Sequence, residues 1–404
     1  MNNTVHRRRI DSGLGARHRS EKLFRLAGIA ALLLSVSFLG VLLSSITLTG
    51  MTVLQQTMVK LDVNIPADTG GANFNGMVKK ALRDVFPEAS TRREKKELYA
   101  LVSSGAAHEL RQFVAASPES AGQMLAIWLP ASDEVDMVTK GTISRDAPPE
   151  VRRLSDQQLA KIDRLIAQER IEKQFNTGFF FNGDSREPEL AGIAAAAMGT
   201  LFSLAVCLLL SFPLGVMAAI YLEEFAPTNR LTDFIEVNIN NLAAVPSIIF
   251  GLLGLAIFLN FFELPRSAPL VGGMVLALMT LPTIIIVGRA SLKAVPPSIH
   301  EAALAVGASK VQSVFHHVLP LAMPGVLTGT IIGMARAVGE TAPLLMIGMV
   351  AFVVDIPKSI LDPATALPVQ VFLWADSPER AFEERTAATI LVLIFFLVAM
   401  NLLA

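Results

Sequence analysis

The sequence has little charge and almost no cysteine. Of its 404 residues, 17% are charged and 52% are hydrophobic, and the mean hydropathy is +0.52. Such values are normal for a polytopic membrane protein and high for a soluble one. Cys207 is the one cysteine, so the chain cannot form an internal disulfide. Its place in an apolar run is typical of a small buried hydrophobe.

Motifs for catalytic chemistry are also missing from the sequence. No G-x-x-x-x-G-K-[ST] loop is present that would hold nucleotide phosphates. Glu109 follows His108, but no second His stands at the offset of the zinc helix motif. The sequence therefore favours a chain that is not an enzyme, binds no metal or cofactor of its own and has no nucleic-acid partner.

The charge that is present is unevenly distributed. Residues 51–189 hold 38 of the 69 charged side chains, whereas residues 190–404 hold only 22. This contrast predicts a water-exposed domain followed by a region in contact with membrane lipid.

Six segments are long and apolar enough to cross a bilayer, which takes roughly 20 residues of helix. They are residues 26–48, 190–222, 237–262, 267–288, 325–349 and 386–404. The first is longer than the apolar part of a signal peptide, and no Ala-x-Ala-like site closes it. We therefore expect a retained transmembrane helix there.

Basic residues indicate the orientation of the spans. Residues 1–25 contain seven Lys and Arg side chains, which places this segment in the cytoplasm by the positive-inside rule. Six spans then return the C-terminus to the cytoplasm. On this topology residues 49–189 are an extracytoplasmic insert, the loop 350–385 is also outside, and the loop 290–322 is inside.

The insert has the pattern of a folded α+β domain that is mainly helical. Residues 58–65 alternate between apolar and polar side chains, as a strand does. Residues 91–114 and 152–176 place apolar side chains at helical spacing and favour two amphipathic helices. The mixed charge of the insert is typical of an ordinary wetted surface, and the sequence indicates no ligand site in it.

The cytoplasmic loop 290–322 reads as helix, glycine, helix. A Pro-Pro pair before Ser298 suits the first turn of a helix over 298–306, and Glu301 stands three residues after Ser298, as in a capping box. Gly307 is suited to end that helix. A second helix to about residue 318 would lead into the fifth span.

Two charged side chains lie within the fifth span. Arg336 stands near the middle of residues 325–349, and Glu340 follows four residues later on the same helix face. A charge at mid-bilayer costs about 2.5–3.5 kcal/mol, so the two either form a structural ion pair or face a translocation path, and both can hold. Arg289, at the cytoplasmic end of the fourth span, either lines an exit or extends to lipid headgroups.

The cytoplasmic loop carries a family resemblance. The loop resembles the EAA loop of ABC importer permeases in its residues and in their spacing. It contains Glu301-Ala302-Ala303, three residues, Gly307, nine residues and then His317-Val318-Leu319-Pro320. The family usually has an aliphatic residue where His317 stands. The resemblance implies that this loop docks on a separate ATPase, which binds the ATP. It assigns the coupling role to Glu301, Ala302, Ala303, Gly307 and Pro320.

A second resemblance covers residues 190–404. Four segments of this region are similar to PstA-type phosphate permeases. They are ARAVGETAPLL around Arg336, NLAAVPSIIFGLLGLAIF at 241–258, GVMAAIYLEEFAP at 215–227 and TLPTIIIVGRASLKAVP at 280–296. The insert is similar to an extended form of that family with an extra N-terminal domain. The resemblance implies six transmembrane helices of the type I ABC importer permease fold in the inner membrane. It also implicates Arg336 and Glu340 in transport.

The same resemblance implies the partners of the chain. They are a PstC-like second permease, a PstB-like ATPase dimer and a PstS-like periplasmic phosphate-binding protein. The leading hypothesis is thus one permease subunit of an ATP-driven phosphate importer. Alternatives are a permease for another oxyanion such as molybdate or sulfate, or a membrane sensor that uses residues 49–189. A secondary transporter would not need the EAA spacing.

Overall fold

The computed structural model describes residues 2–68 and 71–403, without the side chains of residues 2–14, 16 and 403. The basic side chains at positions 7–9 of the expected cytoplasmic segment 1–25 therefore lie outside the described residues. Contacts divide the chain into two units, residues 1–49 and residues 50–404.

The first unit consists of one helix that continues briefly into the second. Helix α1 (Asn2–Met51) contains the whole of the expected span 26–48. Residues Arg17–Leu54 are apolar enough to cross a membrane, and none of their most apolar window is buried. Leu23 and Leu48 are both strongly exposed, as expected of a helix that is covered by lipid.

A three-stranded antiparallel sheet forms the centre of the insert. Strands β1 (Gln55–Asn64), β2 (Met124–Pro130) and β3 (Ile171–Phe175) lie in the order β2-β1-β3. Leu61 pairs with Ile127 of β2, and Met58 pairs with Glu172 of β3. Every second side chain of β1 is buried, because successive side chains point to opposite faces. The expected strand over 58–65 is confirmed.

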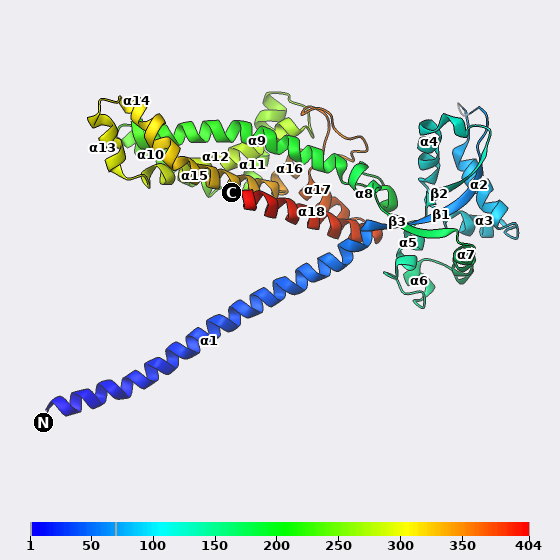
Figure 1. The fold of residues 1–404 in the computed structure, drawn as a ribbon, viewed down its shortest axis with the longest axis horizontal. Coiled ribbons are helices and arrows are strands. Elements are labelled where there is room, and N and C mark those ends of the chain that lie inside the picture. The colour runs from blue at the N-terminus through cyan, green and yellow to red at the C-terminus, as the bar shows by residue number, and fades with distance from the viewer. Residues whose placement is uncertain (1, 69–70, 404) are drawn as a thin grey trace. The chain divides into compact units, whose positions relative to one another are not determined.

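Helices pack around this sheet (Figure 1). They are α2 (Phe74–Val85), α3 (Arg92–Tyr99), α4 (Ala106–Ala116), α5 (Asp133–Lys140), α6 (Pro149–Arg152) and α7 (Asp156–Ala167), with a short 3₁₀ turn η2 (Pro118–Ser120). The expectation of a mainly helical α+β insert is confirmed.

Both helices expected in the insert were too long. The segment 91–114 is divided between α3 and α4, because the chain between them turns at Ser103 and Gly105. The segment 152–176 forms α7 and then β3. Glu169 has a φ of 55° and reverses the chain, and the residues after it gain hydrogen bonds from β1. Periodicity alone could not reveal this exchange of helix for strand.

The region after the insert consists of helices joined by loops, the longest of which is residues 347–366. It contains α8 (Gly178–Phe181), η3 (Pro188–Leu190), α9 (Ala194–Ile220), η4 (Tyr221–Phe225), α10 (Arg230–Ala243), α11 (Ser247–Gly254), η5 (Leu255–Phe261), α12 (Pro269–Lys293), α13 (Pro297–Ala305), α14 (Lys310–Ser313), η6 (Val314–Val318), α15 (Leu319–Val338), α16 (Ala342–Met346), α17 (Leu367–Ala375) and α18 (Ala381–Leu403). Helix α12 lies along α9 and α15 (Figure 1).

The spans agree in number with the expectation only if one bent pair counts as a span. Over the described residues, five helices are long and apolar enough to cross a membrane, and a sixth span arises if α10 and α11 with η5 are taken together. These two parts meet at an angle of 100°. The expected span 237–262 is present only as this bent pair, because Pro246 has an extended conformation and interrupts the helix there.

The fifth expected span is also broken. Instead of one helix over 325–349, α15 ends at Val338, and α16 begins only at Ala342. Pro343 lies in the first turn of α16, where its missing N–H costs no helical hydrogen bond. At its other end α15 continues without interruption from α14 through the π-helical turn η6, so that residues Lys310–Val338 form one membrane-length helix.

Candidate functional site

Helix α13 of the loop 290–322 ends in a defined cap. Helix α13 runs from Pro297 to Ala305, close to the expected 298–306. Gly307 has a φ of 91° and donates its N–H to the carbonyl of Leu304, while Ala308 donates to the carbonyl of Ala303. These two bonds make a Schellman motif, which favours glycine at the left-handed position. The expected helix, with its glycine end, is confirmed.

The capping box lies one helix later than expected. Pro296 is the N-cap of α13, so Ser298 does not cap it. The side chain of Ser309 instead accepts a hydrogen bond from the N–H of Gln312, and the Gln312 side chain accepts from the N–H of Ser309. The two prolines displaced the start of α13 by fixing its first turn before Ser298.

Apolar packing fastens the second half of the loop to two spans. Val314 and Val318 are buried against Ala219 and Ile220 at the end of α9 and Leu292 at the end of α12. The ammonium of Lys310 lies 5.3 Å from the centre of the Phe225 ring. A displacement of the loop would therefore be carried directly into the ends of α9 and α12.

The loop presents a mixed apolar and polar surface to the solvent. Glu301, Ala302 and Pro320 are exposed, whereas Ala303 is buried within the chain. Several apolar side chains of this loop are exposed as well. They are Leu304, Val306, Val311 and Phe315, with Val306 86% exposed. This surface has the composition of a region that another protein covers.

Arg336 and Glu340 come together at the end of α15. Arg336 lies in the last turn of this helix, where a cation is favoured by the helix dipole. Its Nε is 3.6 Å from a carboxylate oxygen of Glu340, which follows after the helix has ended. The Arg336 side chain is 57% exposed and that of Glu340 is 18% exposed.

The register between α15 and α12 gives the depth of this pair. Three glycines of α15 approach α12 in antiparallel order: Gly325 faces Ser291, Gly329 faces Val287 and Gly333 faces Thr283. A Cβ atom at Gly329 would lie 2.2 Å from a methyl of Val287, so only glycine allows this approach. Continuing the register brings Arg336 to the depth of Thr280, the twelfth of the 25 residues of α12. Arg336 therefore lies at the level of the middle of α12, although the helix that carries it ends there.

Two broken elements meet beside this pair. A Cβ at Gly251 of α11 would lie 2.7 Å from Cα of Pro343, so α11 and α16 pack with their backbones close together. Interrupted helices occur inside membranes where the backbone is buried in protein or lines a cavity. The contact between these two interrupted helices was not predicted from the sequence, although Pro246 and Pro343 mark the interruptions.

Arg289 is bonded to carboxylates of two other elements. Its Nε donates to Glu223 of η4 at 3.3 Å, and its terminal nitrogen donates to Glu236 of α10 at 2.7 Å. Arg289 lies near the end of α12, so it joins three segments at one end of the membrane region. Its partners are protein groups, and it is not close to the Arg336–Glu340 pair along the register of α12.

The described residues contain no group of three or more His, Cys, Asp and Glu side chains that could hold a metal ion. Within these residues the site chemistry is thus that of ion pairs, broken helices and the exposed loop 290–322.

Comparison with known proteins finds two families, one for the N-terminal part of the chain and one for the C-terminal part. Residues 211–404 match the family described as "Binding-protein-dependent transport system inner membrane component". Residues 11–149 match "Domain of unknown function (DUF3333)". The second match ends before β3, although β3 completes the sheet of the insert.

Curated relatives agree with the first of these matches. The chain is 33% identical over 214 residues to "Phosphate transport system permease protein PstA 1" of Mycobacterium tuberculosis, covering 53% of this chain and 69% of that protein. It is 31% identical to a PstA protein of Yersinia pestis, covering 53% and 71%. Among solved structures, the methionine ABC transporter MetNI is 17% identical, with a TM-score of 0.42 over 52% of this chain and 92% of that one.

Proposed function

Because this chain belongs to the family of PstA-type phosphate transport system permeases, we propose that it is one permease subunit of an ATP-driven importer of inorganic phosphate. The chain is a multi-pass inner-membrane protein with the helical fold of type I ABC importer permeases. In the proposal, both termini are cytoplasmic and the insert is extracytoplasmic.

The exposure of Arg336 at mid-depth is the observation that carries this proposal. A guanidinium in the middle of the bilayer is costly when it faces lipid. Arg336 is more than half exposed in the single chain, and its ion-pair partner is Glu340. A second permease that packs against this face would enclose the pair in a shared pathway between the subunits.

The chemistry of the pair suits a phosphate ion. A guanidinium stays charged and can donate two parallel hydrogen bonds to two phosphate oxygens. Glu340 holds the Arg336 side chain in place in the absence of phosphate and competes for it during release. Their 3.6 Å separation supports this role, because the pair is close without a strong hydrogen bond that the anion would have to break.

Energy would enter through the loop around α13. Glu301, Ala302, Gly307 and Pro320 would face a groove of a separate ATPase dimer, which binds and hydrolyses ATP. Ala303 would stabilise the loop from within, because it is buried. A periplasmic phosphate-binding protein would deliver the anion from outside. Movement of the loop would tilt α9 and α12, to which it is packed.

Phosphate uptake in cells that lack the natural protein tests the proposal. Arg336→Ala should abolish uptake, and Arg336→Lys should reduce it by about tenfold or more, because an ammonium cannot make the bidentate contact. Arg266→Ala is the matched control, since Arg266 is an exposed arginine in the turn before α12. Normal uptake by both Arg336 variants at normal membrane abundance would contradict the proposed site.

A further inference from the structure

A cavity of 620 Å³ lies where the insert meets the permease region. Helix α2, the link before α4 and the start of α5 form its walls on the insert side. The segment Arg186–Glu189, just before α9, and Glu379, just before α18, form the other side. The cavity is therefore built from both parts of the second unit and lies outside the apolar spans.

Two deeply buried polar atoms at this cavity have no hydrogen-bond partner among the residues that the structure describes. Glu189 is only 6% exposed, and its Oε2 atom is unpaired. Ser132 is 8% exposed, and its hydroxyl is unpaired as well. Both residues line the cavity. An unpaired buried carboxylate oxygen is expensive unless the carboxyl group is protonated or a donor comes from outside the chain.

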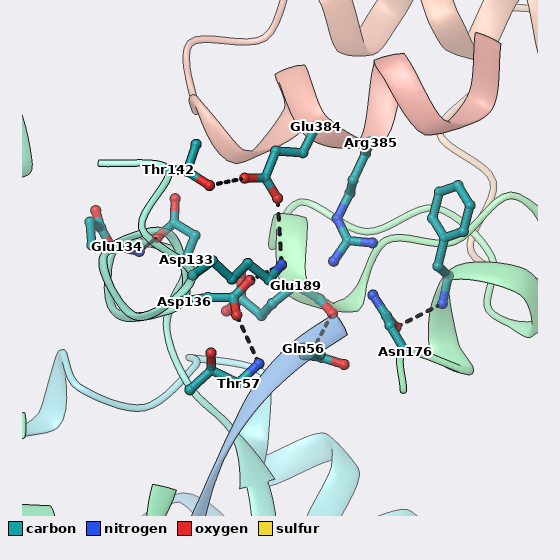
Figure 2. A network of polar contacts seen from close by, with 12 residues as sticks. Gln56, Thr57, Asp133, Glu134, Asp136, Thr142, Asn176, Glu189, Glu384 and Arg385 are labelled. Atoms are coloured by element: carbon teal, nitrogen blue, oxygen red, sulfur yellow. Dashed lines mark hydrogen bonds and ion pairs between the residues drawn. The ribbon is translucent and has the colours of Figure 1, made fainter. Parts of the chain in front are cut away.

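The neighbouring carboxylates, by contrast, are engaged in a network (Figure 2). Asp136 accepts the N–H of Thr57 at 2.7 Å and pairs with Lys140 at 2.6 Å. Glu384 of α18 accepts from Thr142 at 2.8 Å and pairs with Lys140 at 3.4 Å. Lys140 thus forms ion pairs with two other carboxylates, Asp136 and Glu384, and not with Glu189.

The backbone around Glu189 is held by side chains of two other elements. Its carbonyl accepts a hydrogen bond from the Gln56 side chain at 2.8 Å. Two residues later, the carbonyl of Ala191 accepts from Arg385 at 2.6 Å. Figure 2 shows the Glu189 side chain extending toward the turn of α5 that carries Asp133. The buried carboxyl group thus lines the cavity from a segment whose backbone is held in place.

The remaining charges of the cavity are of both signs. The cations are Lys79, Arg153 and Arg186, and the further acids are Asp133, Glu134, Glu187 and Glu379. The volume is much larger than a single ion needs. A ligand that satisfies both signs must carry a cationic donor for Glu189 and an anionic group for the basic side chains.

We propose that this cavity binds a small organic zwitterion of the amino-acid class, with its protonated amine on Glu189 and Ser132 and its carboxylate on the basic side chains. An ammonium supplies several N–H donors, which match the two unpaired oxygens. The guanidinium groups of Arg153 and Arg186 are suited to a carboxylate. The insert is then a ligand-binding domain attached to a permease.

Binding to the full-length protein in lipid nanodiscs tests this proposal. The probes are the twenty common amino acids, together with putrescine as an amine without a carboxylate and inorganic phosphate as an anion without an amine. We expect at least one amino acid to bind, and Glu189→Gln to weaken it by about ten- to a hundredfold, as for the loss of a charged hydrogen bond. Ser104→Trp, at the exposed rim of the cavity, should block binding without touching Glu189.

The control is Glu119→Gln, which neutralises an exposed carboxylate of the insert outside the cavity, and it should bind as the unaltered protein does. Failure of every amino acid to bind at about 10 mM, which corresponds to negligible affinity, would overturn the proposal. So would tighter binding of putrescine or phosphate, or binding that both cavity variants leave unchanged. The measurement involves no transport, so its failure would leave the proposed phosphate import untouched.

Discussion

At the scale of single residues, Glu189 gives the clearest prediction about pH. Burial raises the pKa of its carboxyl from 4.5 to about 7, against a smaller opposing hydrogen bond from Ser103. Asp133 and Glu187 face it and add to the rise, and Arg385 of α18 lies nearby (Figure 2). The folded protein therefore holds this proton more tightly than the unfolded chain does.

The sign of the effect follows from that difference. The stabilisation by the protonated carboxyl is fully present below pH 4.5 and is lost as the pH rises to about 7. We expect the melting temperature to fall over this range, with a loss of about 3–4 kcal/mol at most. Glu189→Gln, which resembles the protonated form, should flatten the profile, whereas Glu119→Gln should not. A profile of unchanged slope in Glu189→Gln would contradict this assignment.

The residues of this cluster could not be predicted from the sequence. Thr57, Asp136, Glu189 and Glu384 come from four segments that are far apart along the chain. No local spacing links them, and only the folding of the insert against the start of α18 brings them together. Arg336 and Glu340 were recognisable, because two charges four residues apart in an apolar run are conspicuous by themselves.

At the scale of elements, the glycine end of α13 offers a test of coupling. Gly307 has a φ of 91° with open space around its Cα, so an added methyl group would strain the backbone without a clash. The strain is about 1–2 kcal/mol for a residue with a side chain. We expect Gly307→Ala to lower the ATPase activity that phosphate and its binding protein stimulate in the reconstituted transporter.

A matched glycine separates this effect from general destabilisation. Gly141, at the end of α5 in the insert, has a φ of 85° and also has open space around it. Gly141→Ala carries the same backbone strain far from the cytoplasmic loop in sequence. Stimulated ATPase activity that falls equally in both variants would argue against a specific coupling role for α13.

Element ends were predictable where local chemistry fixes them. Gly307 and the prolines before α13 marked that helix correctly, apart from the misplaced capping box. The breaks at Pro246 and after Val338 were not predicted as breaks. By hydropathy each of these segments is a continuous apolar run. The bent form of residues 230–261 is seen only in the structure, where α11 packs against α16.

At the scale of the whole molecule, the proposed topology can be tested with the single cysteine. Replacing Cys207 by Ser leaves a chain without cysteine. Val306→Cys and Glu119→Cys then place one exposed thiol on the loop and one on the insert. A membrane-impermeant maleimide should label Glu119→Cys in intact cells and Val306→Cys only after lysis. The opposite pattern would invert the topology and remove the loop from any cytoplasmic ATPase.

The division into an insert and a permease region was predictable from charge alone. Residues 51–189 are rich in charged side chains and residues 190–404 are poor in them, and the sheet and the apolar helices follow that division. The way in which the two parts join was not predictable, because it depends on buried pairs between distant segments.

That join has a mechanical consequence. Chain connections lead from β3 through α8 into α9, and Lys140 bridges Asp136 of the insert to Glu384 of α18. The insert is therefore anchored at two separate helices and turns with them. A tilt of those helices by a few degrees becomes a larger sweep at the distant edge of the insert. On the proposed topology, a fluorescent dye on that edge should report the movement of these helices during transport.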